Sequence, residues 1–326
     1  MGDTGGVLEL FAGIGGVACA WPEAENVVAV DINRQAAAVY RANFRHRYEV
    51  LTIDEGAIER PPLSSLLTRP TWWLSPPCQP YTQRGKQRDW LDRRAEGLRA
   101  CLRAIEHYRP AWLVLENVAS FRQSHSRYQL QSVLERRGYH YQETLLCPAE
   151  FGWPNRRPRY YLIAGQASCR PWRPKPLYHL DVGQLVQSPS ELASDGMTDL
   201  RLPEDVSHRY RDALDRCGPA SLRPTACFTA AYGKTILNAG SYWLDDRSGR
   251  PGWRRFSPRE VARLLGFPDT FHLAPGTPRT MWKLLGNSLS LPVVRYVLSH
   301  LPHGPEPILP WHSATGRRWR PPAGAW

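Results

Sequence analysis

The first half of the chain alternates short apolar runs with amphipathic stretches, and this alternation restricts the fold more than any other feature. The runs VLELF, NVVAVDI, TWWLS and AWLVLEN are separated by helical patterns such as RQAAAVYRANF and LRACLRAIEHY. Strands that alternate with helices are typical of a parallel sheet covered by helices on both faces. Further on, LQSVLERRG predicts a helix that ends at Gly138, and YHYQETLL and RRPRYYLIAG predict two more strands. We therefore expect an α/β fold with a doubly wound sheet over residues 1–165.

The regular pattern is lost after Gly165. The segment CRPWRPKPLYHLDVG is rich in proline and arginine, and no periodicity returns for about 55 residues. A helical pattern begins again with FSPREVARLLGF, in which Ser257 and Glu260 form a predicted capping box. From Pro302 the chain is rich in proline and arginine again. We expect a domain boundary at Gly165 and a loose tail over residues 302–326.

The charge of the chain points to a polyanionic partner. Lysine and arginine number 42 against 30 aspartates and glutamates, for a formal net charge of +12. Nearly all of these cations are arginine, whose planar guanidinium matches phosphates and base edges. Nucleic acid is the expected partner. The alternative is a genome of high GC content that encodes arginine wherever a cation is needed.

Cysteine usage and hydropathy exclude several other classes. The seven cysteines include no CxxC pair, so neither a disulfide framework nor a zinc site is indicated, and no metal is expected. No apolar stretch approaches the roughly 20 residues that a membrane helix needs. The N-terminus MGDTGGVLELF lacks the order of a secretory signal. We therefore expect a cytoplasmic protein that does not contact a membrane.

A glycine-rich turn follows the first predicted strand. In LELFAGIGG the glycines at 13, 15 and 16 allow a ligand to approach the backbone at the start of a helix. Asp31 ends the second strand, from which a carboxylate can bond ribose hydroxyls. Because the pattern is not GxGxxG, a nucleoside without a pyrophosphate fits better than a dinucleotide. The alternative is a tight turn and an ordinary acidic strand end.

Chemically reactive side chains follow the next two strands. Cys78 lies in SPPCQPYTQ, where prolines restrict the loop, and Glu116 follows the apolar run LVL. The carboxyl edge of a parallel sheet is where ligands bind, so both side chains are expected at a site. Arg157 and Arg159 in NRRPR are two residues apart, hence on one side of an extended segment. The alternative for Cys78 is a buried free cysteine in a proline-rich turn.

Taken in order, these segments resemble those of the cytosine-C5 methyltransferases. The resemblance runs from residue 7 to residue 300 and ends with FSPREVARLLGFPDTF and LLGNSLSLPVV. Within the family the chain is most similar to the Dnmt2-type tRNA methyltransferases. That similarity rests on CFTAAY at residues 227–232, on PREVARLLGFP, and on Asn155, where DNA enzymes usually carry glutamine. The segment between Gly165 and Arg223 has no recognisable motif, and the tail extends beyond the usual end of the family.

The resemblance implies a donor, a mechanism and a set of site residues. S-adenosylmethionine would donate the methyl group, and Cys78 would add to C6 of cytosine while Glu116 bonds the N3 edge. Arg157 or Arg159 would raise the thiolate fraction of Cys78. Asp54 in LTIDEG would hold the adenine amino group, although an exposed acid in a turn is its alternative. The other residues implied for the donor site are Phe11, Gly13, Gly15, Asp31 and Asn287.

The resemblance also implies domains and a substrate. The expected parts are a Rossmann-like methyltransferase domain of residues 1–165 plus 284–301, a small target-recognition domain of residues 166–283, and the Pro-rich tail. We expect methylation of a cytosine in a tRNA anticodon loop. The alternative is a DNA methyltransferase of a restriction-modification or epigenetic type. A nucleic-acid-binding protein without catalysis is disfavoured, because the thiol, the carboxylate and both arginines are present.

Two smaller features carry weaker expectations. The stretch from Arg84 to Arg94 holds five cations with Tyr81 and Trp90 nearby, which suits either a phosphate-contacting loop or a solvated helix face. Cys227 opens CFTAAY. A packed core thiol is the favoured interpretation of Cys227, and an approach to the active site is the alternative.

Overall fold

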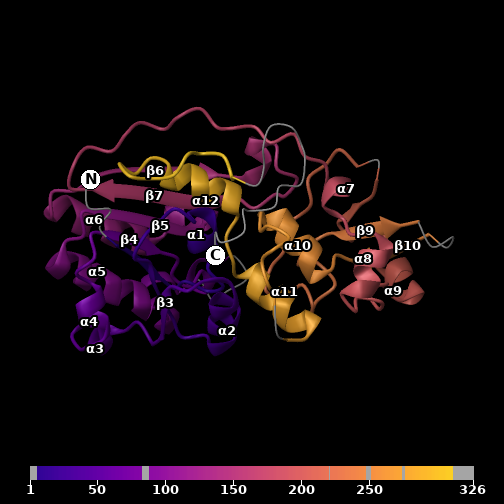
Figure 1. The fold of residues 1–326 in the computed structure, drawn as a ribbon, viewed down its shortest axis with the longest axis horizontal. Helices are drawn as coiled ribbons and strands as arrows, with labels where there is room; N and C mark the ends of the chain where they lie inside the picture. The colour runs from indigo at the N-terminus through magenta and orange to yellow at the C-terminus, as the bar shows by residue number, and fades with distance from the viewer. Residues whose placement is uncertain (1–5, 83–87, 220, 247–250, 274–275, 311–326) are drawn as a thin grey trace.

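A seven-stranded sheet forms the centre of the larger part of the molecule (Figure 1). The computed structural model describes residues 6–82, 88–219, 221–246, 251–273 and 276–310. The strands are β1 (Val7–Leu10), β2 (Val28–Asp31), β3 (Arg47–Val50), β4 (Thr71–Leu74), β5 (Trp112–Val118), β6 (His140–Leu146) and β7 (Arg159–Gly165). They lie in the order β3-β2-β1-β4-β5-β7-β6. β1 to β5 are parallel, and β7 runs antiparallel to both β5 and β6.

Helices cover both faces of this sheet. Because successive side chains of a strand point to opposite faces, Val7 packs in one hydrophobic cluster while Leu8 and Leu10 pack in the other. The first cluster includes residues of α1 (Gly16–Ala20), α2 (Arg34–Asn43) and α12 (Leu291–Leu298). The second includes residues of α3 (Glu55–Ile58), α4 (Leu63–Leu66), α5 (Glu96–Tyr108) and α6 (His125–Arg136). The expected doubly wound α/β fold is confirmed.

One strand of the sheet was not expected. β3 consists of RYEV, whose charged residues do not read as a buried strand. It pairs only with β2 and forms the edge of the sheet. An edge strand accommodates charged side chains, because one side of it faces solvent.

The second half of the chain forms a smaller sheet and short helices on the right of Figure 1. β8 (Arg216–Cys217), β9 (Tyr242–Asp245) and β10 (Gly252–Arg255) lie in the order β10-β9-β8. The helices are α7 (Val182–Leu185), α8 (Pro189–Ser194), α9 (Glu204–Arg209), α10 (Pro258–Leu265) and α11 (Pro278–Gly286). Short 3₁₀ turns are η1 (Gln79–Tyr81), η2 (Asp89–Leu91), η3 (Arg93–Ala95), η4 (Ala119–Gln123) and η5 (Pro148–Phe151). One hydrophobic cluster runs from the large sheet into this smaller part.

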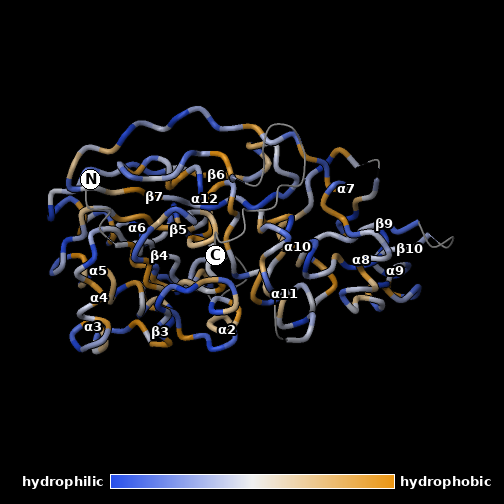
Figure 2. The backbone as a smooth tube through the Cα atoms, viewed as in Figure 1, coloured by the Kyte–Doolittle hydropathy of each residue, from blue (hydrophilic) through white to orange (hydrophobic). Residues whose placement is uncertain are grey.

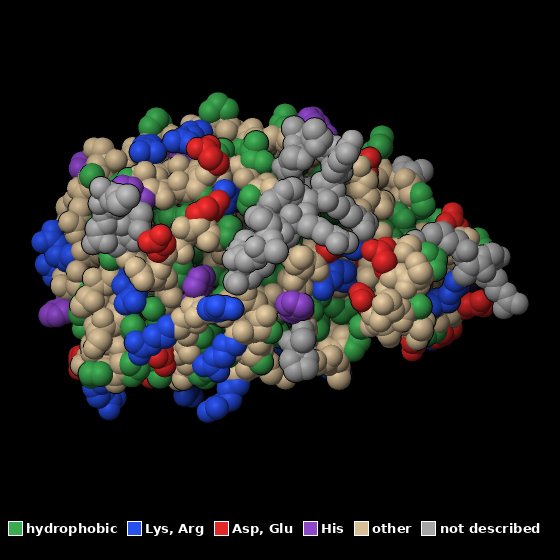
Figure 3. Space-filling view, in the orientation of Figure 1, with side chains coloured by type: hydrophobic (Ala, Val, Ile, Leu, Met, Phe, Trp, Pro, Cys, Tyr) green, Lys and Arg blue, Asp and Glu red, His purple; other side chains and the backbone are tan. Residues whose placement is uncertain are grey.

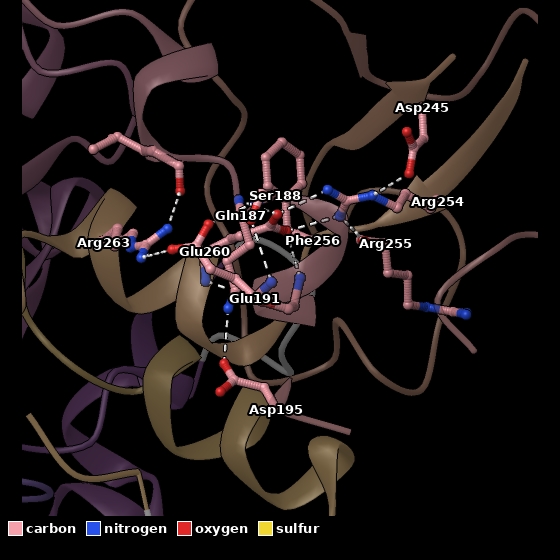
Figure 4. A network of polar contacts seen from close by, with 12 residues as sticks. Gln187, Ser188, Glu191, Asp195, Asp245, Arg254, Arg255, Phe256, Glu260 and Arg263 are labelled. Carbon is pink, nitrogen blue, oxygen red and sulfur yellow. Dashed lines mark hydrogen bonds and ion pairs between the residues drawn. The ribbon is translucent and has the colours of Figure 1, made fainter. Parts of the chain in front are cut away.

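A buried polar network attaches α10 to the small sheet (Figure 4). The expected capping box is confirmed: Ser257 Oγ accepts from the Glu260 amide, and the Glu260 carboxylate accepts from the Ser257 amide at 2.7 Å. The same carboxylate accepts two hydrogen bonds of 2.8 Å from the guanidinium of Arg254 on β10. It also accepts from the backbone amide of Gln187 at 2.8 Å. Glu260 is thus fully buried with its charge paired, as a buried carboxylate requires.

The loss of regular structure expected for about 55 residues after Gly165 is correct only at the start of that segment, because α7, α8, α9 and β8 lie between residues 182 and 217. Residues 166–181 contain no helix or strand and run over the outside of the large sheet as a mainly hydrophilic loop (Figure 2). The expectation of a loose tail is wrong for residues 302–310. Leu309 is buried, its amide donates to the Tyr178 hydroxyl at 3.0 Å, and Arg295 donates to the backbone carbonyls of residues 306 and 308. Residues 311–326 lie outside the described part of the chain.

Candidate active site

The turn after β1 forms one wall of a cavity. Phe11 has φ 61°, Gly13 φ 55° and Gly15 φ 90°, so the chain reverses sharply before α1 begins. Gly13 has open space where a Cβ would be, whereas a Cβ at Gly15 would lie 2.5 Å from the Phe44 ring and 2.8 Å from the Tyr40 ring. Gly13 therefore exposes backbone to the cavity. Gly15 is needed because aromatic side chains pack against it.

The cavity has a volume of about 500 Å³ and lies where β1, β2, β4 and β5 end. Eight of the ten expected site residues line it: Phe11, Gly13, Asp31, Cys78, Glu116, Arg157, Arg159 and Asn287. The expectation that reactive residues meet at the carboxyl edge of the sheet therefore agrees with the geometry. Gly15 and Asp54 are not among the lining residues.

Asp31 holds the turn on one side of the cavity. One carboxylate oxygen accepts from the Gly13 amide and the other from the Asn33 amide, both at 2.8 Å. Burial raises the pKa of Asp31, and these backbone hydrogen bonds oppose the increase. The neighbouring Ile32 lines the cavity although its side chain is 65% exposed, which leaves an apolar surface at the mouth.

Asp54 caps a helix. Its side chain accepts from the Ala57 amide at 2.8 Å, which makes it the N-cap of α3. Its neighbours Thr52 and Ile53 line the cavity. A side-chain acceptor at an N-cap satisfies an amide that the helix leaves free, so this contact has a structural explanation.

Cys78, Glu116 and Arg159 form the other end of the cavity. Cys78 precedes η1 in the loop after β4, Glu116 lies on β5, and Arg159 begins β7. Because β5 and β7 are neighbours, Arg159 Nε comes within 3.3 Å of Glu116 Oε1. Glu116 is 7% exposed, and burial raises its pKa against the opposing effect of Arg159 and Arg157. The carboxyl group is therefore shifted toward its protonated form.

The Cys78 thiol is governed by burial more than by charge. Burial raises its pKa, Arg159 and Arg157 lower it, and Glu116 raises it further. The two arginines act in the direction expected from the sequence. Burial has the larger effect, so the net direction is a raised pKa for the Cys78 thiol.

Arg157 fixes the wall of the cavity that contains Asn287. Its guanidinium donates to the carbonyls of Phe228 at 3.1 Å and Gly286 at 3.1 Å, and to that of Ser288. The carbonyls of Gly286 and Ser288 flank Asn287 in the chain. Asn287 is the C-cap residue of α11. Arg157 is 3% exposed, so these hydrogen bonds replace its hydration.

Cys227 belongs to the same cluster. Its Sγ accepts from Arg157 Nη1 at 3.4 Å and from Arg159 Nη2 at 3.8 Å. Burial raises the pKa of this thiol, but the two arginines outweigh burial and the net effect lowers it. Cys227 belongs to neither hydrophobic cluster of the described residues, so the interpretation as a packed core thiol is wrong. It contacts two arginines that line the cavity but is not itself a lining residue, and its approach to the active site stays a prediction. The signal in the sequence was the position of Cys227 in CFTAAY.

Other residues that were not expected from the sequence also line the cavity. Ser75 directly follows β4, and its side chain lowers the pKa of Glu116 through a hydrogen bond. Gly97 lines the cavity where α5 approaches Phe11, and a Cβ there would lie 2.9 Å from the Phe11 ring. Ser75 could have been identified from the sequence, because it ends the apolar run TWWLS at the expected ligand-binding edge of the sheet. Gly97 had no local signal, because its contact depends on the packing of α5.

The described residues contain neither a candidate metal site nor a helix that could cross a membrane. Within them, no group of three His, Cys, Asp or Glu side chains is placed to hold a metal ion. No described helix has the length and hydrophobicity needed to cross a membrane.

Of the five cations expected in a phosphate-contacting loop, those at 84 and 86 lie outside the described residues. Arg93 and Arg94 line the cavity, and Arg94 pairs with Asp92 at 2.6 Å.

The fold and the cavity define an enzyme of the cytosine-C5 methyltransferase class. The chain belongs to the family described as C-5 cytosine-specific DNA methylase, whose family model matches residues 6–184 and 206–303. The tRNA (cytosine(38)-C(5))-methyltransferase of Schizosaccharomyces pombe is 30% identical over 321 residues, covering 90% of this chain and 96% of that protein. The Homo sapiens protein of the same name is 29% identical and covers 90% of this chain and 98% of its own length.

Two solved structures and one DNA methyltransferase are also similar to this chain. The crystal structure of the S. pombe Dnmt2 methyltransferase has a TM-score of 0.75 at 28% identity, covering 90% of this chain and 97% of that one. The Entamoeba histolytica methyltransferase EhMeth has a TM-score of 0.76 at 26% identity, with the same coverage. The chain is also 26% identical to a DNA (cytosine-5)-methyltransferase of Dictyostelium discoideum, covering 90% of this chain and 93% of that protein.

Proposed function

We propose that this protein methylates C5 of a cytosine in tRNA, with S-adenosylmethionine as methyl donor and Cys78 as covalent nucleophile. The observation that carries the proposal is the placement of Cys78, Glu116 and Arg159 at one end of a single cavity and of Gly13 and Asp31 at the other. A donor and a target base bound in this cavity would have their reacting groups close together.

The donor end of the cavity has the chemistry that S-adenosylmethionine requires. Its volume of about 500 Å³ is within the range of small-molecule sites. Phe11 and the exposed Ile32 supply apolar contacts, Gly13 supplies backbone without a side chain, and Asp31 supplies acceptors for ribose hydroxyls. Bound there, the donor supplies an electrophilic methyl group. Asn287 completes this end, whereas the contact of Asp54 with α3 makes a helix-capping role the simpler one for that residue.

The residues at the other end would act on the cytosine ring. The Cys78 thiol loses its proton to solvent as the sulfur forms a bond to C6, and the electron pair displaced from the ring makes C5 nucleophilic. Glu116, shifted toward its protonated form, holds the N3 edge and stabilises the charge that develops there. Arg159, 3.3 Å from Glu116, keeps that carboxyl group in place. Once C5 carries the methyl group, loss of the C5 proton breaks the bond between sulfur and C6 and releases Cys78.

The smaller part of the molecule would recognise the substrate. Residues 166–283 contain short helices and a three-stranded sheet, and no long recognition helix appears among those that the structure describes. This favours a substrate read by shape over a sequence read in the major groove of DNA. The anticodon loop of a tRNA presents unstacked bases, so flipping its cytosine costs less than flipping one in a duplex.

The surface of the protein agrees with a folded RNA partner. Basic side chains are visible around α2, β3 and α5 in Figure 3, and Arg34, Arg41, Arg45 and Arg47 of this region are exposed. Such a surface contacts phosphates without reading sequence. The similarity to enzymes named for tRNA supports the same substrate. The DNA alternative is supported by the family description and by the Dictyostelium relative.

Methyl transfer measured side by side on total tRNA and genomic DNA tests the proposal. We expect label from the donor in one tRNA cytosine, located by bisulfite sequencing in cells with and without the gene. Label in DNA with no tRNA cytosine changed would replace the tRNA proposal with the DNA alternative. No label in either, with both substrates freed of existing methylation, would contradict the proposed activity.

A further inference from the structure

The Cys227 thiol lies between the guanidinium groups of Arg157 and Arg159. Its Sγ is 3.4 Å from Arg157 Nη1 and 3.8 Å from Arg159 Nη2. A guanidinium only donates hydrogen bonds, so the sulfur accepts in both contacts. The sulfur also lies 3.7 Å from the Phe228 carbonyl, a contact in which a thiol would be the donor. Because a thiolate is a far better acceptor than a thiol, the two charge-assisted contacts with the guanidinium groups favour the ionised form of Cys227 over the thiol that would donate to Phe228.

A rigid contact between two chain segments holds Cys227 in this position. Asn155 and Thr225 form an isolated parallel bridge, and the Thr225 amide donates to the Pro154 carbonyl at 3.0 Å. The Asn155 side chain donates to the Thr225 hydroxyl at 2.9 Å and to the Ala226 carbonyl at 3.1 Å. Asn155 and Thr225 are both fully buried. The two segments therefore run side by side, so that Cys227 lies next to the arginines of NRRPR.

Several titratable groups face Arg157 and Arg159. Besides Cys227, the titratable groups that face the pair are Glu116, Cys78 and Tyr161. Burial raises the pKa of each of these three groups. For Cys227 burial acts in the same direction, but Arg157 and Arg159 together outweigh it and the pKa is lowered. Arg157 is 3% exposed and the Arg159 side chain 15%, so an anionic Cys227 would add to the carbonyl contacts of Arg157 and the Glu116 contact of Arg159 in offsetting the cost of burying their charges.

We propose that Cys227 is the resting thiolate of this site and acts as a positioning residue, whose charge holds the guanidinium of Arg159 toward Glu116 while Cys78 remains a thiol. This inference rests on the proposed function for its catalytic consequence. The identity of the ionised thiol does not depend on any substrate. Cys227 is therefore assigned a role distinct from that of the nucleophile.

The ultraviolet absorbance of thiolates tests the ionisation directly in the full-length protein, without donor or nucleic acid. We expect one thiolate at neutral pH in the wild type and in Cys78→Ala, and its loss in Cys227→Ser. Cys169→Ser is the matched control, because the Cys169 thiol donates to two backbone carbonyls and burial raises its pKa. It should keep the signal. A neutral-pH thiolate that disappears in Cys78→Ala, or that persists in Cys227→Ser, would overturn the proposal.

The effect of Cys227 on catalysis is tested by comparing the activities of two variants at this position. Cys227→Ser should lower kcat/KM roughly ten- to hundredfold, as expected when a supporting group that aligns the site is lost. Cys227→Asp restores a negative charge and should retain more activity than Cys227→Ser. A role in packing alone predicts the opposite order, since serine is closer to cysteine in size. The opposite order among folded variants, with folding checked by thermal melting, would contradict the positioning role.

The two measurements separate this inference from the proposed function. If neither tRNA nor DNA is methylated, the proposed function fails while the thiolate titration still gives its answer. If methylation occurs but no thiol ionises at neutral pH, the proposed function stands and the inference about Cys227 is wrong.

Discussion

The side-chain amide of Asn155 donates to the hydroxyl of Thr225 at 2.9 Å, across 70 residues of sequence. The Thr225 hydroxyl in turn donates to the Pro154 carbonyl at 3.0 Å. This relay joins the segment that contains Arg157 and Arg159 to the segment that contains Cys227. The charged end of the cavity is therefore assembled by a buried polar contact between two loops.

Thr225→Val should weaken this contact. Valine has nearly the shape of threonine but neither donates to Pro154 nor accepts from Asn155, so two buried hydrogen bonds are lost. The Pro154 carbonyl keeps the Thr225 amide, and the Asn155 side chain keeps the Ala226 carbonyl. We expect the free energy of unfolding to fall by about 1–3 kcal/mol. Thr225→Ser keeps the hydroxyl and should lose less. Urea unfolding of the three proteins measures the difference, and equal stability of the valine and serine variants would contradict the relay.

Cys78 should form a covalent adduct with its target. An RNA that carries 5-fluorocytosine at the modified position should trap the protein, because fluorine cannot leave C5 as a proton does. Cys78→Ala should form no adduct and show no turnover while binding the donor normally. Denaturing gels reveal the adduct. Undiminished methylation by Cys78→Ala would rule out the covalent mechanism.

Glu116 and Asp31 should affect different steps, because they lie at opposite ends of the cavity. Glu116→Gln should slow the chemical step by roughly a hundredfold or more, the usual effect of losing a positioned acid, with little change in donor affinity. Asp31→Ala should weaken donor binding. Single-turnover rates and calorimetric donor titrations separate the two effects. A Glu116→Gln variant impaired only in donor binding would show that the two roles are wrongly assigned.

The outcome for particular residues shows what the sequence was able to predict. Cys78 follows β4, whereas Glu116, expected directly after its strand, lies within β5 two residues before its end. Parallel strands end at one edge of a sheet, so local pattern and topology sufficed to place the two residues together. The roles of Gly15 and Cys227 depend on contacts with residues far along the chain: the rings of Tyr40 and Phe44, and the arginines of NRRPR. Such contacts leave no periodic signal. Leu309 illustrates the same point, because a proline-rich composition does not reveal that one leucine is buried.

A second buried carboxyl, which the sequence analysis did not single out, should make stability depend on pH. Glu9 lies on β1, 1% exposed, with Oε1 accepting from the Val17 amide at 3.2 Å and no partner for Oε2 among the described residues. Burial raises its pKa to about 8 from 4.5. A folded-state pKa above the unfolded value means that its contribution to stability is fully present below about pH 4.5 and is lost as pH rises through about 8.

Replacing this carboxyl should remove that part of the pH dependence. Glu9→Gln keeps an acceptor for the Val17 amide and cannot ionise, so it should be more stable than the wild type at about pH 9 and similar to it at about pH 4. Urea unfolding at the two pH values gives the comparison. The difference between variant and wild type isolates Glu9 from other groups that titrate. A variant less stable than the wild type at the higher pH would show that the folded protein favours the Glu9 carboxylate.

Arg93 should contact the phosphate backbone of the nucleic acid. It is exposed and lines the mouth of the cavity, whereas its neighbour Arg94 is paired with Asp92. If Arg93 neutralises one phosphate, Arg93→Ala should weaken RNA binding and reduce the slope of log affinity against log salt by about 1. Arg136→Ala is the control, because Arg136 is exposed at the end of α6 and pairs with Glu106 at 2.6 Å. Fluorescence anisotropy over a salt series measures both slopes. Loss of affinity in Arg93→Ala with an unchanged slope would mean that this arginine acts through the shape of the cavity mouth and not through a phosphate.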